Sequence, residues 1–205
     1  YKVVRVDPTK KLVALTFDDG PDPYGTPVVL ETLEKYKAKG TFFMLGSRVK
    51  EYPDLAVRIR DEGHELGNHS WSHPLLTRIS ADKVAQEINS TVDIIEQTTG
   101  QKPTVFRPPY GGFNQTVVDQ LKGIPVIMWE VDTNDWKYRS EARLLEEVKK
   151  QVHDRSIILM HDIHKTTADG LDAVIQYLKD EDYHFVTTTE MLDVIAYDKE
   201  NKDTK

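Results

Sequence analysis

The chain alternates short runs of β-branched and apolar residues with longer stretches of helical period. This alternation is typical of repeated βα units, in which helices cover a parallel sheet, so we predict an α/β fold. Seven such units form either an open, doubly wound sheet or a closed barrel, and periodicity alone does not choose between them. Both architectures place ligands at the carboxyl ends of the strands. The strands are expected at residues 12–17, 41–45, 65–68, 104–106, 126–129, 156–160 and 184–187.

Helices are expected between these strands. Thr26 has the character of an N-cap and is followed by Pro27 at the first helical position, while Pro53 opens the next helix. Within residues 80–100, apolar side chains recur at spacings of three and four, which predicts a helix with one apolar face. The remaining helices are expected at residues 114–122, 140–153, 168–179 and 189–196.

Length and composition indicate one domain, expected to span residues 1–205 with its core in residues 12–196. Apolar residues make up 39% of the chain and charged residues 30%, which is ordinary for a globular protein. No apolar run approaches the roughly 20 residues that a membrane span requires. The net charge of −7, without a block of Lys or Arg, argues against a nucleic-acid partner. We expect a monomer.

The chain contains no cysteine. A disulfide framework and thiolate metal ligands are therefore excluded, and any metal must be held by His, Asp or Glu. The chain opens on Tyr1 and shows no signal-peptide pattern, so we expect a processed or excised domain whose targeting segment lies elsewhere.

Two histidines stand four residues apart in the run His69-Ser70-Trp71-Ser72-His73. On a helical turn, this spacing places both imidazoles on one face, where they can bind a single cation. The spacing also arises by chance in a chain with seven histidines, so ordinary loop histidines are the alternative.

Adjacent carboxylates, Asp18 and Asp19, follow the first expected strand and precede Gly20. Neighbouring side chains at a strand end point in different directions, and Gly20 permits the sharp turn that aims both into a site. One carboxylate can then bind metal while the other acts as a base. A plain turn has the same composition and is the alternative.

Two prolines stiffen the segment Arg107-Pro108-Pro109-Tyr110-Gly111, because each fixes its own φ and restricts the residue before it. Such a segment can hold Arg107 in a defined pose beside a carboxylate. A proline-stiffened loop with a surface arginine is the alternative.

Carboxylates at Asp132 and Asp135 stand beside Trp136, and His161 ends the apolar run that contains Leu159. His161 can act as a general acid if a carboxylate such as Asp135 holds its other ring nitrogen. It can equally be a plain surface residue at a strand terminus.

All of these residues follow expected strands, so we expect their side chains to converge on one rim of the sheet or barrel. Asp18 and Asp19 follow the first strand, His69 and His73 the third, Arg107 the fourth, Asp132 and Asp135 the fifth, and His161 the sixth.

The order of five motifs, T-F-D-D-G, H-S-W-S-H, R-P-P-Y-G, D-T-N-D-W and L-M-H, closely resembles that of the polysaccharide deacetylases of carbohydrate esterase family four. These enzymes share a NodB homology domain, and the resemblance spans about Leu12 to Ile195. It implies a distorted, incompletely closed (β/α)7-type barrel.

The resemblance also implies roles for individual residues. Asp18 is then the catalytic base, oriented by Arg107, and Asp19 joins His69 and His73 on a divalent cation. The cation is most often Zn²⁺, with Co²⁺ or another divalent ion as alternatives.

The other motifs carry the remaining roles by the same resemblance. His161 protonates the leaving amine while Asp135 holds it, and the backbone N–H of Tyr110 stabilises the oxyanion. Tyr110, Trp136 and Leu159 bind the substrate, the last two as walls of the pocket for the acetate methyl group.

The expected activity is hydrolysis of N-acetyl groups on peptidoglycan or on chitin-like polymers of β-1,4-linked N-acetylglucosamine. The alternatives are an esterase that removes O-acetyl groups from xylan and an inactive relative that only binds glycan. The resemblance further implies an extracellular or cell-wall location. The histidines outside the motifs are expected to be structural or exposed: His64, His153, His164 and His184.

Overall fold

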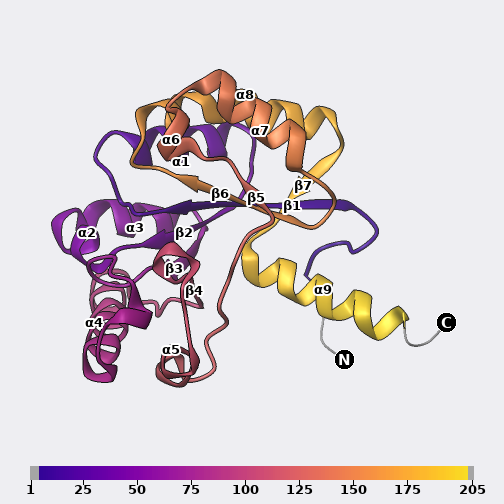
Figure 1. Cartoon of the computed structure of the whole chain (residues 1–205). Helices are drawn as coiled ribbons and strands as arrows, with labels where there is room; N and C mark the ends of the chain where they lie inside the picture. The colour runs from indigo at the N-terminus through magenta and orange to yellow at the C-terminus, as the bar shows by residue number, and fades with distance from the viewer. Residues whose placement is uncertain (1–4, 203–205) are drawn as a thin grey trace.

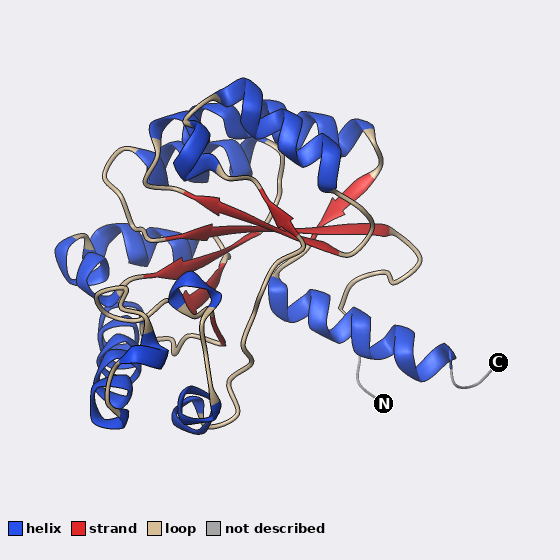
Figure 2. Cartoon of the chain, viewed as in Figure 1, coloured by secondary structure: helices blue, strands red, loops and turns tan. Residues whose placement is uncertain are grey.

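The computed structural model describes residues 5–202, which form a seven-stranded parallel sheet with helices on both sides (Figures 1 and 2). The sheet runs in the order β4-β3-β2-β1-β6-β5, and β7 pairs with β1 outside this path. Its strands are β1 (Lys11–Asp18), β2 (Gly40–Met44), β3 (Glu65–Asn68), β4 (Val105–Phe106), β5 (Val131–Asp132), β6 (Ser156–His161) and β7 (Tyr183–Phe185).

The central strand β1 has three partners. Residues 15–18 pair with β2, residues 13–18 pair with β6, and residues 11–13 pair with β7. Its side chains are buried on both faces of the sheet, because Val13, Leu15 and Phe17 belong to one core cluster and Leu12 and Ala14 to another. Such burial on both faces is typical of parallel sheets covered by helices.

The sheet is not closed by hydrogen bonds over the described residues, since no ladder joins its edge strands β4 and β5. This arrangement confirms the incompletely closed barrel that the motif resemblance implied. The expected strand at 126–129 was wrong, because this segment leads from β4 across to β6 and pairs along neither. At one end the Ile127 N–H donates to the Phe106 carbonyl, and at the other the Glu130 N–H donates to the Ile157 carbonyl, so only an isolated bridge forms, at Val126.

Helices cover the two faces of the sheet unequally. α1, α7 and α8 pack together over one face, above the sheet in Figure 1, while α9 lies under the other. α2 to α5 lie beside the end of the sheet formed by β2, β3 and β4. The helices are α1 (Gly25–Lys35), α2 (Gly46–Glu51), α3 (Pro53–Asp61), α4 (Ala81–Thr99), α5 (Gln115–Leu121), α6 (Asp135–Tyr138), α7 (Glu141–Gln151), α8 (Lys165–Asp180) and α9 (Thr188–Lys202).

Local signals account for some helix ends. The Ser80 hydroxyl caps α4 by accepting the Lys83 N–H, and Gly100 ends it with a φ of 75°, as expected for a left-handed C-cap. Thr26 is not an N-cap, because α1 already begins at Gly25, whose N–H is accepted by the Asp22 carboxylate. The short helices α2 and α6 were not predicted, since four to six residues carry too little periodicity.

None of the helices described between residues 5 and 202 has the length and apolar character needed to cross a membrane.

Candidate active site

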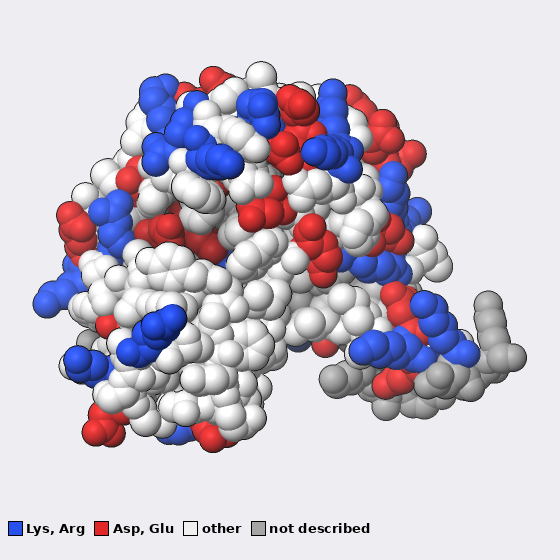
Figure 3. Space-filling view, in the orientation of Figure 1, with Lys and Arg blue, Asp and Glu red and all other residues white. Residues whose placement is uncertain are grey.

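The structure brings the motif residues together at the carboxyl ends of the strands, around one cavity of about 470 Å³. In Figure 3 this rim is hollowed, and Asp and Glu atoms lie in the hollow. The cavity is lined by Asp18, Asp19, His69, His73, Pro108, Tyr110, Trp129, Asp132, Trp136, Leu159, His161, Ile163 and His164.

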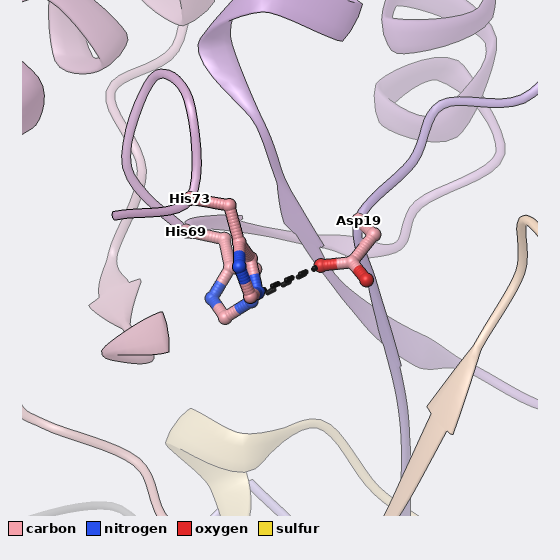
Figure 4. Close-up of side chains that lie close together, drawn as sticks. All are labelled: Asp19, His69 and His73. Carbon is pink, nitrogen blue, oxygen red and sulfur yellow. Dashed lines mark ion pairs between the residues drawn. The ribbon is translucent and has the colours of Figure 1, made fainter. Parts of the chain in front are cut away.

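Asp19, His69 and His73 face one another across the cavity floor (Figure 4). Asp19 Oδ1 lies 3.2 Å from His69 Nε2 and 3.4 Å from His73 Nε2. One ligand atom from each of the three residues falls within 4.8 Å of the others. Such a spacing of two imidazole nitrogens and a carboxylate oxygen suits a single divalent cation, with room left for exchangeable ligands.

The hydrogen bonds of these residues fit a cation. His69 Nδ1 lies 2.6 Å from the Arg107 carbonyl, which can only accept, so Nδ1 carries a proton and Nε2 faces Asp19. Asp19 Oδ1 is buried and has no hydrogen-bond partner among the described residues. A cation shared by this oxygen and the Nε2 atoms of His69 and His73 would supply the positive charge that the buried oxygen lacks. The residues present therefore fit a bound metal ion.

Electrostatics act differently on the three residues. Burial lowers the pKa of His69, but the charge of Asp18 and the hydrogen bond and charge of Asp19 raise it above its ordinary value, so a bound cation would displace a proton there. Burial raises the pKa of Asp19, but its contact with His69 and the charges of His69, His161 and His73 outweigh burial and hold the pKa at about 2. Burial, together with the neighbouring charge of His69, lowers the pKa of His73. Asp19 is thus a carboxylate at neutral pH, and His73 favours the neutral imidazole.

The segment from His69 to His73 is a loop, so the expectation of a helical turn was wrong. Ser70 and His73 adopt left-handed backbone conformations, with φ of 72° and 65°. The Asn68 side chain accepts the Ser70 N–H, and the Ser70 hydroxyl accepts the His73 N–H. These local bonds bend the chain so that the two imidazoles meet without a helix.

Asp18 forms a buried ion pair with Arg107, whose side chain is fully inaccessible to solvent. Arg107 Nη1 donates to Asp18 Oδ1 at 2.8 Å and to the Thr16 hydroxyl at 2.7 Å. The rest of the guanidinium donates to the carbonyls of Ile127 and Met128. With its donors used in this way, Arg107 holds one carboxylate oxygen of Asp18 in a fixed position.

His161 and Asp135 form a second charged pair. His161 Nδ1 lies 2.7 Å from Asp135 Oδ1, and Asp135 Oδ2 accepts the His161 backbone N–H and the Thr167 hydroxyl. Burial lowers the pKa of His161, but the hydrogen bond and charge of Asp135 and the charges of Asp18 and Asp19 raise it to about 9. His161 is therefore an imidazolium at neutral pH, with Nε2 turned toward the cavity, 3.9 Å from Asp19 Oδ2.

Aromatic and apolar side chains surround this polar floor. Tyr110 is 72% exposed and Trp136 is 55% exposed, although both line the cavity. Leu159, on β6, is buried and lines the same cavity. The Tyr110 ring packs edge-on against His73, with 4.7 Å between ring centroids, and its backbone φ is 60°.

Sequence reasoning missed several residues around the site. His164, expected to be structural or exposed, is buried and lines the cavity, with its ring centroid 5.8 Å from that of His161. Asp162 is also buried and accepts the Thr26 hydroxyl. Burial raises the pKa of Asp162 to about 7, and the charges of Asp19 and Asp18 add to this. Proximity to the L-M-H motif was the only sequence signal for either residue.

Comparisons with known proteins agree with the geometry. Residues 5–128 match the model of the polysaccharide deacetylase family. The chain is 49% identical over 193 residues to the peptidoglycan-N-acetylmuramic acid deacetylase PdaC of Bacillus subtilis, covering 94% of this chain and 41% of that protein. It is 48% identical over 183 residues to the peptidoglycan-N-acetylglucosamine deacetylase PgdA of Listeria monocytogenes, covering 89% and 39%. The chain thus spans about two fifths of the length of these curated relatives.

The solved structure of PdaC from Bacillus subtilis superposes on this one with a TM-score of 0.92 at 47% identity. The match covers 96% of this chain and 97% of that one, so it extends beyond the residues that match the family model. With the family model matched over more than half of its length and the fold shared across nearly all of it, the chain belongs to the polysaccharide deacetylase family.

Proposed function

We propose that this protein is a metal-dependent deacetylase that hydrolyses N-acetyl groups on a glycan polymer to a free amine and acetate. One observation carries the proposal: a buried carboxylate oxygen on Asp19 faces two imidazole nitrogens, between an ion-paired carboxylate at Asp18 and a charged imidazole at His161. A cation site between a base and an acid suits metal-assisted hydrolysis of an amide.

Asp19, His69 and His73 would hold the cation, and Zn²⁺ is the ion that we propose. A bound Zn²⁺ supplies Lewis-acid chemistry, because it polarises a carbonyl group and makes water a stronger acid. Three protein ligands suit a catalytic site, since a structural zinc is closed by a fourth.

Asp18 is the proposed general base. Arg107 holds its Oδ1, which leaves Oδ2 facing the cavity, 3.6 Å from His69 Nε2. Asp18 removes a proton from the attacking water as the water oxygen bonds to the acetamide carbon. The backbone N–H of Tyr110 is the proposed donor to the oxyanion that develops on the carbonyl oxygen.

His161 is the proposed general acid. Its Nδ1 is occupied by Asp135, so the proton on Nε2 is the one available to the cavity. As the bond between carbon and nitrogen breaks, His161 transfers this proton to the leaving nitrogen, and the products are acetate and the free amine. Trp136 and Leu159 are the proposed walls around the acetyl methyl group, and the exposed rings of Tyr110 and Trp136 offer contact surfaces for sugar rings.

Peptidoglycan is the proposed substrate, with chitin-like oligomers as the related polymer. The names of PdaC and PgdA support this choice, although one acts on N-acetylmuramic acid and the other on N-acetylglucosamine. Action on peptidoglycan would place the protein at the cell wall or outside the cell.

The test is incubation of the zinc-loaded protein with peptidoglycan fragments, chitin oligomers and acetylated xylan, followed by mass spectrometry. We expect losses of single acetyl groups from the first two substrates, with new free amines at identified sugars. Turnover of xylan alone would instead define an O-acetyl esterase. Binding of chitin oligomers without acetate release, unchanged in Asp18→Ala, would define an inactive glycan-binding relative.

A further inference from the structure

The loop between the two histidines of the proposed cation site is held by a carboxylate outside the family motifs. We propose that Glu87, on α4, is a positioning residue that sets the cation affinity of the site by fixing this loop; the inference rests on the proposed function. Glu87 touches neither His69 nor His73 in any described hydrogen bond or ion pair. It bonds instead to two of the three residues between them, Trp71 and Ser72.

Glu87 accepts three hydrogen bonds from two consecutive loop residues. Its Oε2 accepts the backbone N–H groups of Trp71 and Ser72, both at 2.9 Å, and its Oε1 accepts the Ser72 hydroxyl at 2.7 Å. Hydrogen bonds to a charged acceptor contribute more than neutral ones. One side chain therefore fixes the middle of the loop.

The remaining backbone groups of the loop bond to the start of α2 and to the end of β3. The Gly46 N–H donates to the Ser70 carbonyl at 3.0 Å, and the Ser47 N–H donates to the Trp71 carbonyl at 3.2 Å. Asn68 Oδ1 accepts the Ser70 N–H. Glu87 is thus the only described partner of the Trp71 and Ser72 N–H groups, and nothing else in the described chain replaces it there.

The loop packs closely against the start of α2. A Cβ atom at Gly46 would lie 2.4 Å from the Trp71 ring and 2.7 Å from the Thr91 hydroxyl, so glycine is required where the loop meets α2. Asn68 Nδ2 also donates to the Ile88 carbonyl of α4, directly beside Glu87. The loop is therefore bound to α2 by its carbonyls and to α4 by its N–H groups.

The loop needs this support because two of its residues adopt left-handed conformations, which are unfavourable for residues other than glycine. One of them is His73, whose imidazole is a proposed ligand. Without Glu87, the Trp71 and Ser72 N–H groups lose their acceptor, and the loop relaxes toward ordinary conformations. Relaxation moves His73 away from Asp19 and His69, and cation affinity falls.

The experiment measures Co²⁺ affinity of the metal-free protein by competition with a chromophoric chelator. Glu87→Ala should weaken affinity by about 10- to 100-fold, the range for partners that orient metal ligands. Glu87→Gln should recover most of it, because its amide oxygen can accept both N–H groups and its NH₂ can donate to the Ser72 hydroxyl. Glu96→Ala removes an exposed carboxylate from the same helix and should bind Co²⁺ as the unaltered protein does.

Three outcomes would overturn the inference: unaltered affinity in Glu87→Ala, a loss in Glu87→Gln as large as in Glu87→Ala, or an equal loss in Glu96→Ala. Circular dichroism of the metal-free variants separates loop relaxation from unfolding, since the inference requires that Glu87→Gln keep the secondary structure of the unaltered protein. Failure of the proposed function looks different, because the unaltered protein would then bind no Co²⁺ or would bind it equally well after Asp19→Ala.

Discussion

The two halves of the candidate site are positioned by different means. Asp18 and His161, the proposed base and acid, end neighbouring strands and occupy paired positions in the ladder between β1 and β6. His73, a proposed metal ligand, lies on a loop with two left-handed residues. The proton-transfer half is thus built into the sheet, whereas part of the cation half depends on side chains that hold a loop.

This difference has energetic consequences. Asp18 is 3% exposed and paired with the buried Arg107, so disturbing it leaves a charge without a partner in the protein interior. Ser72 is exposed and Glu87 is half-buried, so two of the three bonds between this loop and Glu87 lie at the surface. We call Asp18 and His161 with their partners the sheet half, and the loop that carries His73 the loop half. We therefore expect changes in the sheet half to alter stability as well as activity, and changes in the loop half to alter mainly cation affinity.

Removal of the cation is the strongest test of the difference between the two halves of the site. Treatment with a chelator should abolish deacetylation, because Asp19, His69 and His73 would lose the ion that they share, while the sheet should stay folded. Acetate release and far-ultraviolet circular dichroism, followed before and after chelation and after return of Zn²⁺, measure both. Global unfolding on chelation would show that the cation supports the fold, and the separation of the two halves would be wrong.

Loss of the base has the next largest expected effect. Asp18→Asn keeps an oxygen to accept from Arg107 but cannot take a proton, so kcat should fall by about 100- to 10,000-fold. The variant should still bind Co²⁺, because Asp18 is not a proposed ligand. Kinetics on chitin oligomers and Co²⁺ titration measure the two properties. A variant that retains activity would remove Asp18 from the role of base.

Asp135→Asn should lower the pKa of His161, the proposed general acid. Asp135 holds the pKa of His161 at about 9, above its ordinary value of 6.5, so His161 is protonated at lower pH and loses its proton as pH rises through about 9. The stability contributed by this pair is therefore present below about pH 6.5 and is lost as pH rises through about 9. In the variant, the raised pKa falls, and the alkaline limb of kcat should move to lower pH.

The control for this prediction is a comparison at equal metal loading, because a cation beside His161 lowers its pKa in both proteins. Profiles of kcat against pH, measured with saturating Zn²⁺, show where the alkaline limb of the variant lies relative to that of the unaltered protein. Coincident limbs would show that Asp135 does not tune the acid. A uniform fall in kcat at every pH would assign Asp135 to orientation alone.

Much of the sheet half could be predicted from the sequence. The apolar runs at β1, β2, β3 and β6 coincide with strands, and the rule that parallel strands place ligands at their carboxyl ends predicts that Asp18 and His161 meet. The strand predictions failed where the local sequence pattern does not determine which strand a segment pairs with. The segment 126–129 has the composition of a strand, but the chain bonds to β4 at Ile127 and to β6 at Glu130, so it pairs along neither strand.

The loop half could be predicted only in part. The spacing of His69 and His73 predicts a shared cation, but it predicts that a helical turn brings the two imidazoles together. In the structure, left-handed residues and distant hydrogen-bond partners do so. Glu87 stands 15 residues from Ser72, and Thr16 stands 91 residues from Arg107. Contacts at such separations follow from the folded topology and leave no periodic signal in the sequence.

Thr16→Val should have the smallest effect on chemistry, and it tests whether the sheet half is held independently of the loop half. Thr16 accepts from Arg107 Nη1 inside the protein, and valine of similar shape leaves Arg107 bonded to Asp18 without this acceptor. Thr16 also donates to the Ile158 carbonyl, so valine removes two buried hydrogen bonds, one of them with a charged group. Their loss should cost about 2 to 4 kcal/mol of stability. At this chain length, each kcal/mol lowers Tm by about 2 to 4 °C.

Co²⁺ affinity of the Thr16→Val variant should stay unaltered, which is the reverse of the pattern expected for Glu87→Ala. A Thr16→Val variant with weakened Co²⁺ affinity and unaltered Tm would show that the two halves are not held independently.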